Sequence, residues 1–251
     1  MVNDGSTDNT SDICKKNDVT EVYHPYSMGN GAAIKSGARK ASGDILVFMD
    51  ADGQHKPEDI EKLLNKLDEG FDMVVGARDR ASQASFGRLT ANTIYNKLAS
   101  LMVGHKVQDL TSGFRAVKAS MFKEFLHLLP NGFSYPTTST MAFFRAGYRV
   151  AYVPITAAAR IGKSHINITK DGVRFLLIIF KIGSLYSPLK IFTPISALMF
   201  LLGIFRYIYT YIESGTFTNM SALLISTALI VFLIGLVSEQ ITMLIYQGNK
   251  K

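Results

Sequence analysis

Cysteine and charged residues are scarce in this sequence of 251 residues. The single cysteine, Cys14, excludes an internal disulfide framework and a cysteine-rich zinc site, and it favours a reducing environment that faces the cytosol. Charged residues make up 19% of the chain and hydrophobic residues 47%, which excludes a disordered or collagen-like protein. The length fits one large domain, or one domain with an appendage, and the composition predicts a sizeable core.

Three further features are missing from the sequence. A polar string follows Met1 at once, so we expect no signal peptide and expect any membrane attachment to come from the C-terminal part. No basic patch is interleaved with aromatic residues, so a nucleic-acid partner is not expected. The histidines lack metal-ligand spacing and are interpreted as structural or solvent-facing; they are His24, His55, His105, His127 and His165.

The formal net charge of +7 is unevenly distributed. Residues 1–160 carry 19 basic and 17 acidic side chains, whereas residues 161–251 carry 8 and 3, so the second part supplies +5 of the +7. Because this excess lies beside long apolar runs, it indicates an anionic lipid surface as a partner.

Residues 1–160 alternate between strand and helix patterns, which predicts an α/β domain with a largely parallel sheet. The apolar run Ile45–Met49 is typical of a strand that is covered on both faces. A helix is expected from Pro57 to Gly70, and the next strand at Met73–Val75. Only Met1 and Val2 precede the turn-like NDGS string, so we expect the first strand and helix of such a domain to be missing from this sequence.

Later elements follow from the same patterns. Helices are expected at Leu89–Val103, Ala119–Leu129 and Thr137–Ala146, and a strand at Arg149–Val153. From Ile161 onward apolar residues are interleaved with lysine and arginine, which predicts an amphipathic juxtamembrane segment.

Two apolar stretches follow, Ile191–Ile212 and Met220–Tyr246, and each is long enough to cross about 30 Å of hydrocarbon. The loop between them has no lysine or arginine, while the flanks do, so both flanks are expected in the cytoplasm. Arg206 can reach an interface by snorkelling. Glu239 is either a functional intramembrane carboxylate or an interfacial residue.

An acidic triplet, Asp50, Ala51 and Asp52, ends the predicted strand, where open α/β sheets bind ligands. With Gln54 it supplies hard oxygen ligands that suit Mg²⁺ or Mn²⁺ holding a diphosphate. Taken alone, the triplet is explained slightly better as an acidic turn that caps the helix at Pro57.

An ordered series of motifs runs through the chain: VNDGSTDNT at Val2–Thr10, GNGAAIKSGARKASGD at Gly29–Asp44, DADGQHKPED at Asp50–Asp59, GAR at Gly76–Arg78 and DLTSGFR at Asp109–Arg115. This series resembles the GT-A-fold glycosyltransferases related to dolichyl-phosphate mannose synthase and the bacterial polyprenyl-phosphate hexose transferases. The resemblance implies three parts: a Rossmann-like GT-A domain at 1–164, an amphipathic segment at 165–187 and a two-helix transmembrane hairpin at 188–251.

The resemblance also implies roles for single residues. Asp4 is expected to hold the nucleotide base, with a plain Asx turn as the alternative. Asp50 and Asp52 are expected to hold the metal and the donor's phosphates, with Gln54 in the metal shell. Further contacts to the nucleotide sugar are expected from Gly29, Gly31, Ala51, Ser112 and Gly113. A simple loop-to-helix turn is the alternative for Gly29 and Gly31. In the family the DLTSGFR string forms a loop near the sugar and the acceptor, and a helix or turn cap is the alternative for Asp109.

Basic side chains are the candidates for the acceptor's phosphate, because arginine forks match phosphate oxygens. Surface solvation is the alternative for each of them taken singly. Together with Asp52, we expect Arg78 and Arg160 to act in catalysis. The full set of acceptor candidates is Arg78, Arg88, Arg115, Arg160, Lys163 and Ser164.

Two departures from the family pattern bear on the reaction. Asn3 stands where relatives often have an aspartate, and YPTTST at Tyr135–Thr140 stands where many relatives have an acidic residue. A sugar hydroxyl needs a base to deprotonate it, whereas a phosphate monoester is already ionised near neutral pH. The missing carboxylate therefore favours a polyprenyl phosphate acceptor.

The predicted activity is an inverting, metal-dependent hexose transfer from a nucleotide sugar of the UDP-glucose or GDP-mannose type to polyprenyl phosphate. It is placed at the cytoplasmic face of the plasma membrane, in cell-envelope or glycan modification, and self-association is compatible with the hairpin. The alternatives are a saccharide-extending membrane synthase of the same fold and a non-catalytic membrane-anchored remnant.

Overall fold

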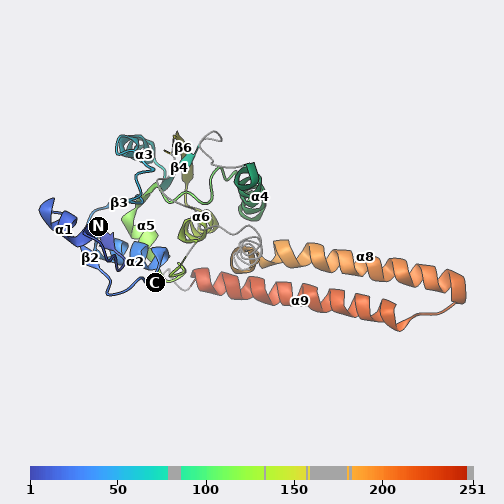
Figure 1. The fold of residues 1–251 in the computed structure, drawn as a ribbon. Coiled ribbons are helices and arrows are strands. Elements are labelled where there is room, and N and C mark those ends of the chain that lie inside the picture. Colours follow the sequence, from blue (N-terminus) through green and yellow to red (C-terminus); the bar gives the residue numbers. More distant parts are fainter. Residues whose placement is uncertain (79–85, 133, 157, 159–179, 181–182, 248–251) are drawn as a thin grey trace. The chain divides into compact units, whose positions relative to one another are not determined.

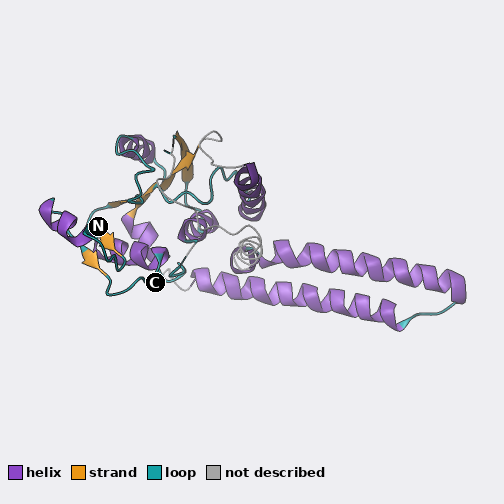
Figure 2. Ribbon diagram, viewed as in Figure 1, coloured by secondary structure: helices purple, strands orange, loops and turns teal. Residues whose placement is uncertain are grey.

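The computed structural model describes residues 1–78, 86–132, 134–156, 158, 180 and 183–247, with side chains described from residue 92 to 244 within the later ranges. The chain divides into two compact units, Met1–Ser164 and His165–Lys251, which are treated separately below. Figure 1 shows the elements of both units, and Figure 2 distinguishes helices, strands and loops.

The first unit contains two sheets among its described residues. In the smaller one, β1 (Val2–Asn3) pairs in parallel with β2 (Val22–Tyr23). The larger sheet has the order β3-β5-β4-β6, with bounds Ile45–Phe48, Arg115–Lys118, Met73–Arg78 and Val150–Ile155. β3, β4 and β6 run in one direction, as the α/β pattern predicts, and β5 runs against them. The sequence patterns did not predict β5.

Within the described residues of the first unit, six helices connect or cover these strands. The helix expected before Gly70 begins at Asp59 rather than Pro57, and the one expected at Ala119–Leu129 ends after Glu124. The remaining expected helices lie within about two or three residues of their predicted bounds. The helices are α1 (Thr10–Lys16), α2 (Asn30–Lys40), α3 (Asp59–Asp68), α4 (Phe86–Val103), α5 (Ala119–Glu124) and α6 (Tyr135–Arg145).

One face of the larger sheet packs against α3. Leu63 and Leu67 of this helix are buried and lie in one cluster with β-strand side chains. Alternation along β5 and the residue just before it, Phe114, explains this contact, because successive side chains of an extended segment point to opposite faces. Phe114 and Ala116 therefore join α3, together with Val74, Ala151 and Ile155 from the neighbouring strands.

The opposite face of the sheet packs against α5 and α6. The Phe48 ring lies 4.7 Å from the Phe122 ring and 6.3 Å from the Tyr135 ring, measured between centroids. Arg115 points into this same layer, since it pairs with Phe48 across β3 and β5. The core of this layer is thus aromatic, with one arginine inside it.

The expectation that the Ile45–Met49 run is covered on both faces is wrong for the described residues. Leu46 and Phe48 are buried, but Ile45, Val47 and Met49 are 36–44% exposed. The reason is topological: α3 packs over β4, β5 and β6, and β3 is the edge strand of its sheet.

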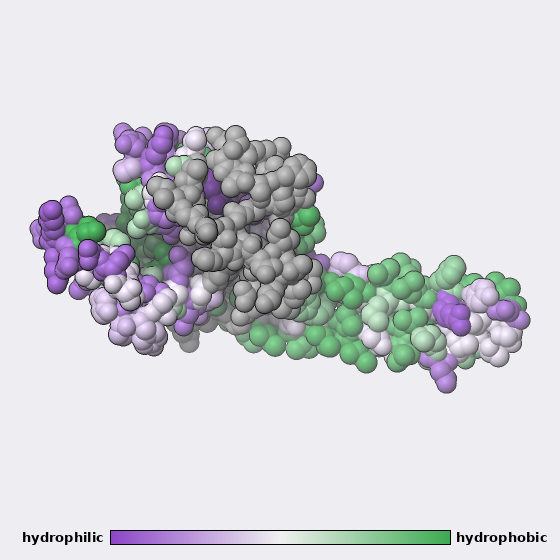
Figure 3. All heavy atoms as spheres, in the orientation of Figure 1, coloured by the Kyte–Doolittle hydropathy of each residue, from purple (hydrophilic) through white to green (hydrophobic). Residues whose placement is uncertain are grey.

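Most of the described part of the second unit is a hairpin of two long helices. Its helices are α8 (Pro188–Ser214) and α9 (Asn219–Gln247), and both are long and apolar enough to span a membrane. Gly215 adopts a left-handed conformation and ends α8. Figure 3 shows apolar side chains over most of the visible hairpin surface, with polar residues towards the connecting loop. The amphipathic segment predicted at 165–187 lies largely outside the described residues.

Small residues form the contact between the two hairpin helices. On α8 the buried positions Ser196, Gly203 and Thr210 recur every seven residues. On α9 the same spacing relates the buried positions Ser221, Ala228, Gly235 and Thr242. A seven-residue repeat keeps one seam of each helix facing its partner, and small residues let the backbones approach closely.

The Glu239 carboxylate of α9 bonds the first turn of α8 within this hairpin. It is 9% exposed, and its Oε2 accepts a bond from the Leu189 amide at 3.5 Å, in the first turn of α8. Amides in the first turn of a helix lack intrahelical partners, so a carboxylate there is stabilising. Arg206 is exposed and lies 5.9 Å from the Tyr209 ring centre.

Candidate functional site

The acidic triplet lies where β3 ends, as the sequence predicts. Asp50 is exposed and Asp52 is partly exposed, and the Asp52 carboxylate accepts the Gln54 amide at 3.1 Å, which closes a tight turn. The Asp50 side chain lies beside Gly113, since a Cβ placed on that glycine would approach the Asp50 Oδ2 to 3.3 Å. The DADGQ and DLTSGFR motifs, far apart in sequence, therefore meet at one edge of the sheet.

Gly113 is held against this edge by α6. The Tyr135 hydroxyl donates to the Gly113 carbonyl at 2.9 Å, and a Cβ on Gly113 would come within 3.1 Å of that hydroxyl. Burial raises the Tyr135 pKa, and the nearby Asp50 charge adds to this rise, although Arg115 opposes it. Tyr135 thus remains a neutral donor that fixes the loop beside Asp50.

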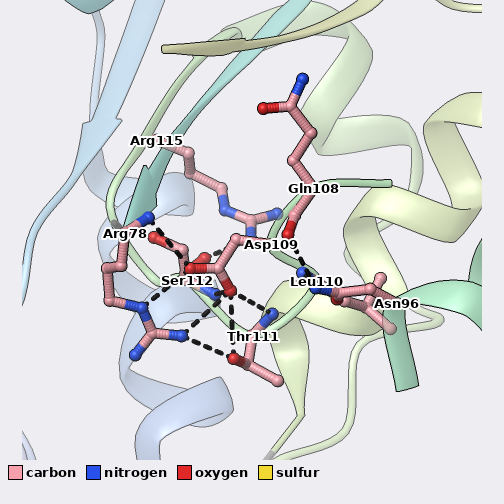
Figure 4. Close-up of polar contacts among 8 residues, drawn as sticks. All are labelled: Arg78, Asn96, Gln108, Asp109, Leu110, Thr111, Ser112 and Arg115. Atoms are coloured by element: carbon pink, nitrogen blue, oxygen red, sulfur yellow. Dashed lines mark hydrogen bonds and ion pairs between the residues drawn. The ribbon is translucent and has the colours of Figure 1, made fainter. Parts of the chain in front are cut away.

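Arg78, the last residue of β4, is bound by the same loop (Figure 4). Its Nε lies 2.8 Å from the Asp109 Oδ2, its Nη2 lies 3.0 Å from Oδ1, and the Thr111 hydroxyl accepts from Nη2 at 2.6 Å. Burial lowers the Arg78 pKa, but the Asp109 carboxylate and the charge of Asp50 outweigh this and raise it. Arg78 therefore stands close enough to Asp50 for their charges to interact.

The structure corrects the prediction for Arg115. Its side chain is fully buried, and its Nη1 donates to the Ser139 hydroxyl at 2.7 Å and the Thr140 hydroxyl at 3.1 Å. Its Nη2 donates to the Ser112 carbonyl. A guanidinium enclosed in this way presents no surface to a lipid phosphate, so Arg115 supports the loop from inside.

Ser112 also differs from its predicted role. It is 1% exposed, its amide donates to Asp109 at 3.1 Å, and its carbonyl accepts from Arg115. It thus connects the two charged side chains beneath the loop and offers no exposed surface to a nucleotide sugar. Gly113, the next residue, is the loop position that remains partly exposed beside Asp50.

His55 adjoins the acidic pair, which the sequence analysis did not predict. Its ring stacks on Phe114 with 4.8 Å between centroids, and its buried Nδ1 makes no hydrogen bond within the described part of the chain. Burial lowers the His55 pKa, and the charges of Asp50 and Asp52 only partly oppose this. Its position directly after Gln54 was the available signal.

Gln54 ties this edge to the segment after β6. Its carbonyl accepts the Ala158 amide at 3.0 Å, and its side-chain Nε2 donates to the Ala158 carbonyl at 3.3 Å. The amide oxygen Oε1 is thereby turned away from this contact. Ala158 stands two positions before Arg160, which lies outside the described residues together with Lys163 and Ser164. The side chain of Arg88, at the start of α4, is also outside the description.

Asp4 is engaged by a neighbouring loop. Its carboxylate accepts bonds from the Met28 and Gly29 amides, the Ser27 hydroxyl and His24, all between 2.7 and 2.9 Å. Burial raises the Asp4 pKa, but these bonds outweigh it and lower the value to about 2. Four donors use the acceptor capacity of a carboxylate. Asp4 therefore orders the loop that carries Ser27, Met28 and Gly29, which is more than a simple Asx turn, and its contact with a nucleotide base stays a prediction.

Gly29 and Gly31 likewise differ from the phosphate contacts that were predicted. The Gly29 amide donates to Asp4, and the Gly31 amide donates to the Gly132 carbonyl at 3.0 Å. A Cβ on Gly31 would come within 2.0 Å of the Pro130 carbonyl oxygen. These glycines let α2 pack closely on residues 130–132, as the loop-to-helix alternative implies.

Asn3 explains one departure from the family pattern. It is 2% exposed, and its Nδ2 donates to Glu21 at 2.8 Å and to the Ser11 hydroxyl at 3.0 Å. Its Oδ1 accepts the Ser6 amide at 2.9 Å. An aspartate could not donate to Glu21, so the amide at this position matches its acidic neighbour.

The acidic edge has the donor chemistry of a divalent cation site. Asp50 and Asp52 supply carboxylates, and the Gln54 Oε1 is a further hard oxygen. Among the described residues, no three His, Cys, Asp or Glu side chains gather as a metal cluster. Mg²⁺ commonly binds through one or two carboxylates together with substrate phosphates, so the residues present fit such an ion when a diphosphate completes its shell.

Sequence comparison assigns the family. Residues 1–126, half of the chain, match the model of glycosyl transferase family 2. The chain is a family 2 glycosyltransferase. Residues 187–244 of this glycosyltransferase match the GtrB C-terminal hairpin, which is found in polyprenyl-phosphate hexose transferases and coincides with α8 and α9.

Individual relatives match parts of the glycosyltransferase. The uncharacterized protein MJ1222 of Methanocaldococcus jannaschii is 35% identical over 134 residues, which are 50% of this chain and 55% of that protein. The match thus spans little more than half the length of this relative.

Solved structures show the same fold at lower identity. Glucosyl-3-phosphoglycerate synthase from Mycobacterium tuberculosis, in complex with Mn²⁺, UDP and glucosyl-3-phosphoglycerate, has a TM-score of 0.57 and 22% identity, over 73% of this chain and 66% of that one. The same enzyme with Mn²⁺, UDP-glucose and phosphoglyceric acid gives the same values. These similarities establish the GT-A fold.

Proposed function

We propose that this glycosyltransferase moves a hexose from a nucleotide sugar to a polyprenyl phosphate at the cytoplasmic face of the plasma membrane. The observation that carries the proposal is the meeting of Asp50, Gly113 and Arg78 at one edge of the sheet, in a chain that also has a hairpin of the GtrB type. Carboxylates for a metal and a cation for a phosphate are thus within range of each other's charge.

The donor is expected at the acidic edge. Asp50 and Asp52, with the Gln54 Oε1, would hold Mg²⁺ or Mn²⁺, which when bound neutralises charge developing on the departing diphosphate. The Tyr135 hydroxyl fixes the Gly113 loop beside this position. Complexes of the M. tuberculosis enzyme that contain Mn²⁺ and UDP-glucose support a UDP-sugar as the first donor to test, with GDP-mannose as the second.

The acceptor phosphate is expected at Arg78, with Arg160, Lys163 and Ser164 as further predicted contacts. Two Arg78 nitrogens are fixed by Asp109 and Thr111, so the guanidinium is oriented before the acceptor arrives. An ionised phosphate oxygen then attacks the anomeric carbon opposite the leaving diphosphate, and the configuration inverts. The hydroxyl-rich start of α6 is compatible with this reaction, because a phosphate monoester needs no protein base.

The proposal is tested by incubating membranes that contain the chain with polyprenyl phosphate, Mn²⁺ and UDP-glucose or GDP-mannose. Mass spectrometry should detect a lipid-phosphate hexose. Asp52→Ala should reduce its formation about 100-fold or more, because it removes a carboxylate that is expected to hold the metal. A 100-fold loss corresponds to about 2.7 kcal/mol of transition-state stabilisation.

Glu61→Gln is the matched control, since Glu61 is an exposed carboxylate on α3 in the same βα unit. It should retain full activity. If wild-type membranes form no product with any nucleotide sugar, the transferase proposal is contradicted. The same holds if Asp52→Ala is as active as Glu61→Gln.

A further inference from the structure

Asp109 makes more hydrogen bonds than a simple turn cap needs. Its side chain is 4% exposed, and its two oxygens accept from the Thr111 and Ser112 amides, from the Arg78 amide and from two Arg78 side-chain nitrogens. The loop amides and the arginine share Oδ1 (Figure 4). One buried carboxylate therefore joins the end of β4 to the loop that precedes β5.

The consequence for Arg78 is a fixed orientation. Asp109 and Thr111 take its Nε and Nη2, and in Figure 4 its Nη1 points away from both of them. No bond to Nη1 is recorded within the described residues. The Arg78 side chain is 28% exposed, so this remaining nitrogen can meet an anion that approaches the edge where Asp50 stands.

We propose that Asp109, assisted by the Thr111 hydroxyl, is a positioning residue that aims the Nη1 of Arg78 at the acceptor phosphate. This inference rests on the proposed function. The bidentate geometry matters because a guanidinium held at two nitrogens keeps one defined direction for the third. Lysine at position 78 could not be oriented in this way.

A second buried carboxylate, next to the other end of β4, provides a comparison for Asp109. Asp72 precedes β4, its side chain is 6% exposed, and its oxygens accept from Lys118 Nζ at 2.8 Å and from the Arg149 amide at 2.8 Å. It matches Asp109 in burial and in ion pairing but adjoins the opposite end of the strand. Loss of Asp72 should therefore show the effect of removing a buried ion pair that contributes to stability but lies away from the site.

The test is a double-mutant cycle on transfer kinetics. It begins once membranes with the wild-type chain have been shown to form product. Arg78→Ala should lower kcat/KM for polyprenyl phosphate about 100-fold, and Asp109→Asn about 10-fold or more. The double variant should be no worse than Arg78→Ala within about threefold, because both changes remove one interaction. Asp72→Asn should lower kcat/KM by less than about threefold. In the double variant with Arg78→Ala, the two fold-changes should multiply, because the residues act independently.

Thr111→Val is the milder variant, and it leaves no buried charge unpaired. We expect it and Asp109→Asn to raise the KM for polyprenyl phosphate while the KM for the nucleotide sugar stays unchanged. A merely structural role would lower kcat through the amount of folded enzyme and leave both KM values unchanged.

Multiplicative effects of Arg78→Ala and Asp109→Asn, or unchanged acceptor KM values in both Asp109→Asn and Thr111→Val, would overturn the positioning role. If Asp109→Asn does not fold, Thr111→Val and its double variant with Arg78→Ala decide the question alone. Absence of product from the wild type contradicts the proposed function itself, so the two failures are distinguishable.

Discussion

The two units of this glycosyltransferase bury polar side chains in different ways. In the first unit one cluster of buried polar side chains lies at one end of the sheet, where Ser112 bonds both Asp109 and Arg115, and Arg115 bonds α6. In the hairpin, buried polar and small residues are spread evenly, at intervals of seven along each helix.

The difference shows that a buried hydroxyl can belong either to a site or to a helix-packing seam. Ser139 bonds a guanidinium from a strand 24 residues away, whereas Ser196 donates to the Ala228 carbonyl of the facing helix at 2.7 Å. Both are buried serines in helices. A clustered set supports a site, and a periodic set supports helix packing. The variants below break each arrangement in turn.

The largest effect is expected from breaking the cluster at Arg115. Arg115→Ala removes the partner of two hydroxyls and two carbonyls and leaves a cavity, so it should lower the free energy of unfolding of the first unit by about 3–5 kcal/mol. Chemical denaturation followed by circular dichroism measures this. Arg39→Ala, an exposed arginine of α2, should change it by less than about 0.5 kcal/mol. Equal effects of the two variants would contradict the internal role of Arg115.

A smaller effect is expected from breaking the periodic seam. A Cβ at Gly203 would lie 2.8 Å from Ile225 Cγ1 and 3.2 Å from the Ile225 amide nitrogen. Gly203→Leu should therefore separate the helices and lower the stability of the hairpin in detergent by about 1–3 kcal/mol.

The control for the seam is Leu201→Ala on the same helix, because Leu201 is 64% exposed. Thermal unfolding in detergent should show a lowered transition for Gly203→Leu and little change for Leu201→Ala. A seam variant that melts like the wild type would show that the helices do not pack through Gly203.

The smallest effect is expected at Asp4, which lies outside both arrangements. Its pKa in the folded chain, about 2, is below the ordinary 3.8, so the unfolded state binds more protons between these values. The stabilisation is thus present above pH 3.8 and is lost as the pH falls towards 2.

Asp4→Asn should lower the free energy of unfolding by about 1 kcal/mol near neutral pH, because hydrogen bonds to a charged acceptor are lost. Measured by denaturation at several pH values, the difference from wild type should shrink below pH 3.8. A difference that is independent of pH would contradict the role of the Asp4 charge.

Much of the fold could be predicted from local periodicity. The apolar run before Asp50 and the helical spacing after Pro57 predicted β3 and α3, and the long apolar stretches predicted the two hairpin helices. β5 was missed because its four residues, beginning with Arg115, show neither a long apolar run nor clear alternation. An antiparallel strand inserted between parallel neighbours is decided by tertiary pairing.

The site was predictable in its motifs and less so in its contacts. Asp50, Asp52, Gly113 and Arg78 do come together, as a shared sheet edge implies. Arg115 was interpreted as a phosphate ligand because arginine forks match phosphate oxygens. Its actual partners are hydroxyls and carbonyls on α6 and the preceding loop, and no local pattern reveals contacts of that kind.

The central claim is that an already ionised phosphate, without a protein base, receives the hexose. The most direct test offers the chain polyprenyl phosphate and the phosphate-free polyprenol of the same length, with the same nucleotide sugar and Mn²⁺, and follows lipid-linked hexose by mass spectrometry. The account predicts product from the phosphate only, and its loss in Asp52→Ala. Transfer to the alcohol at a comparable rate would contradict it.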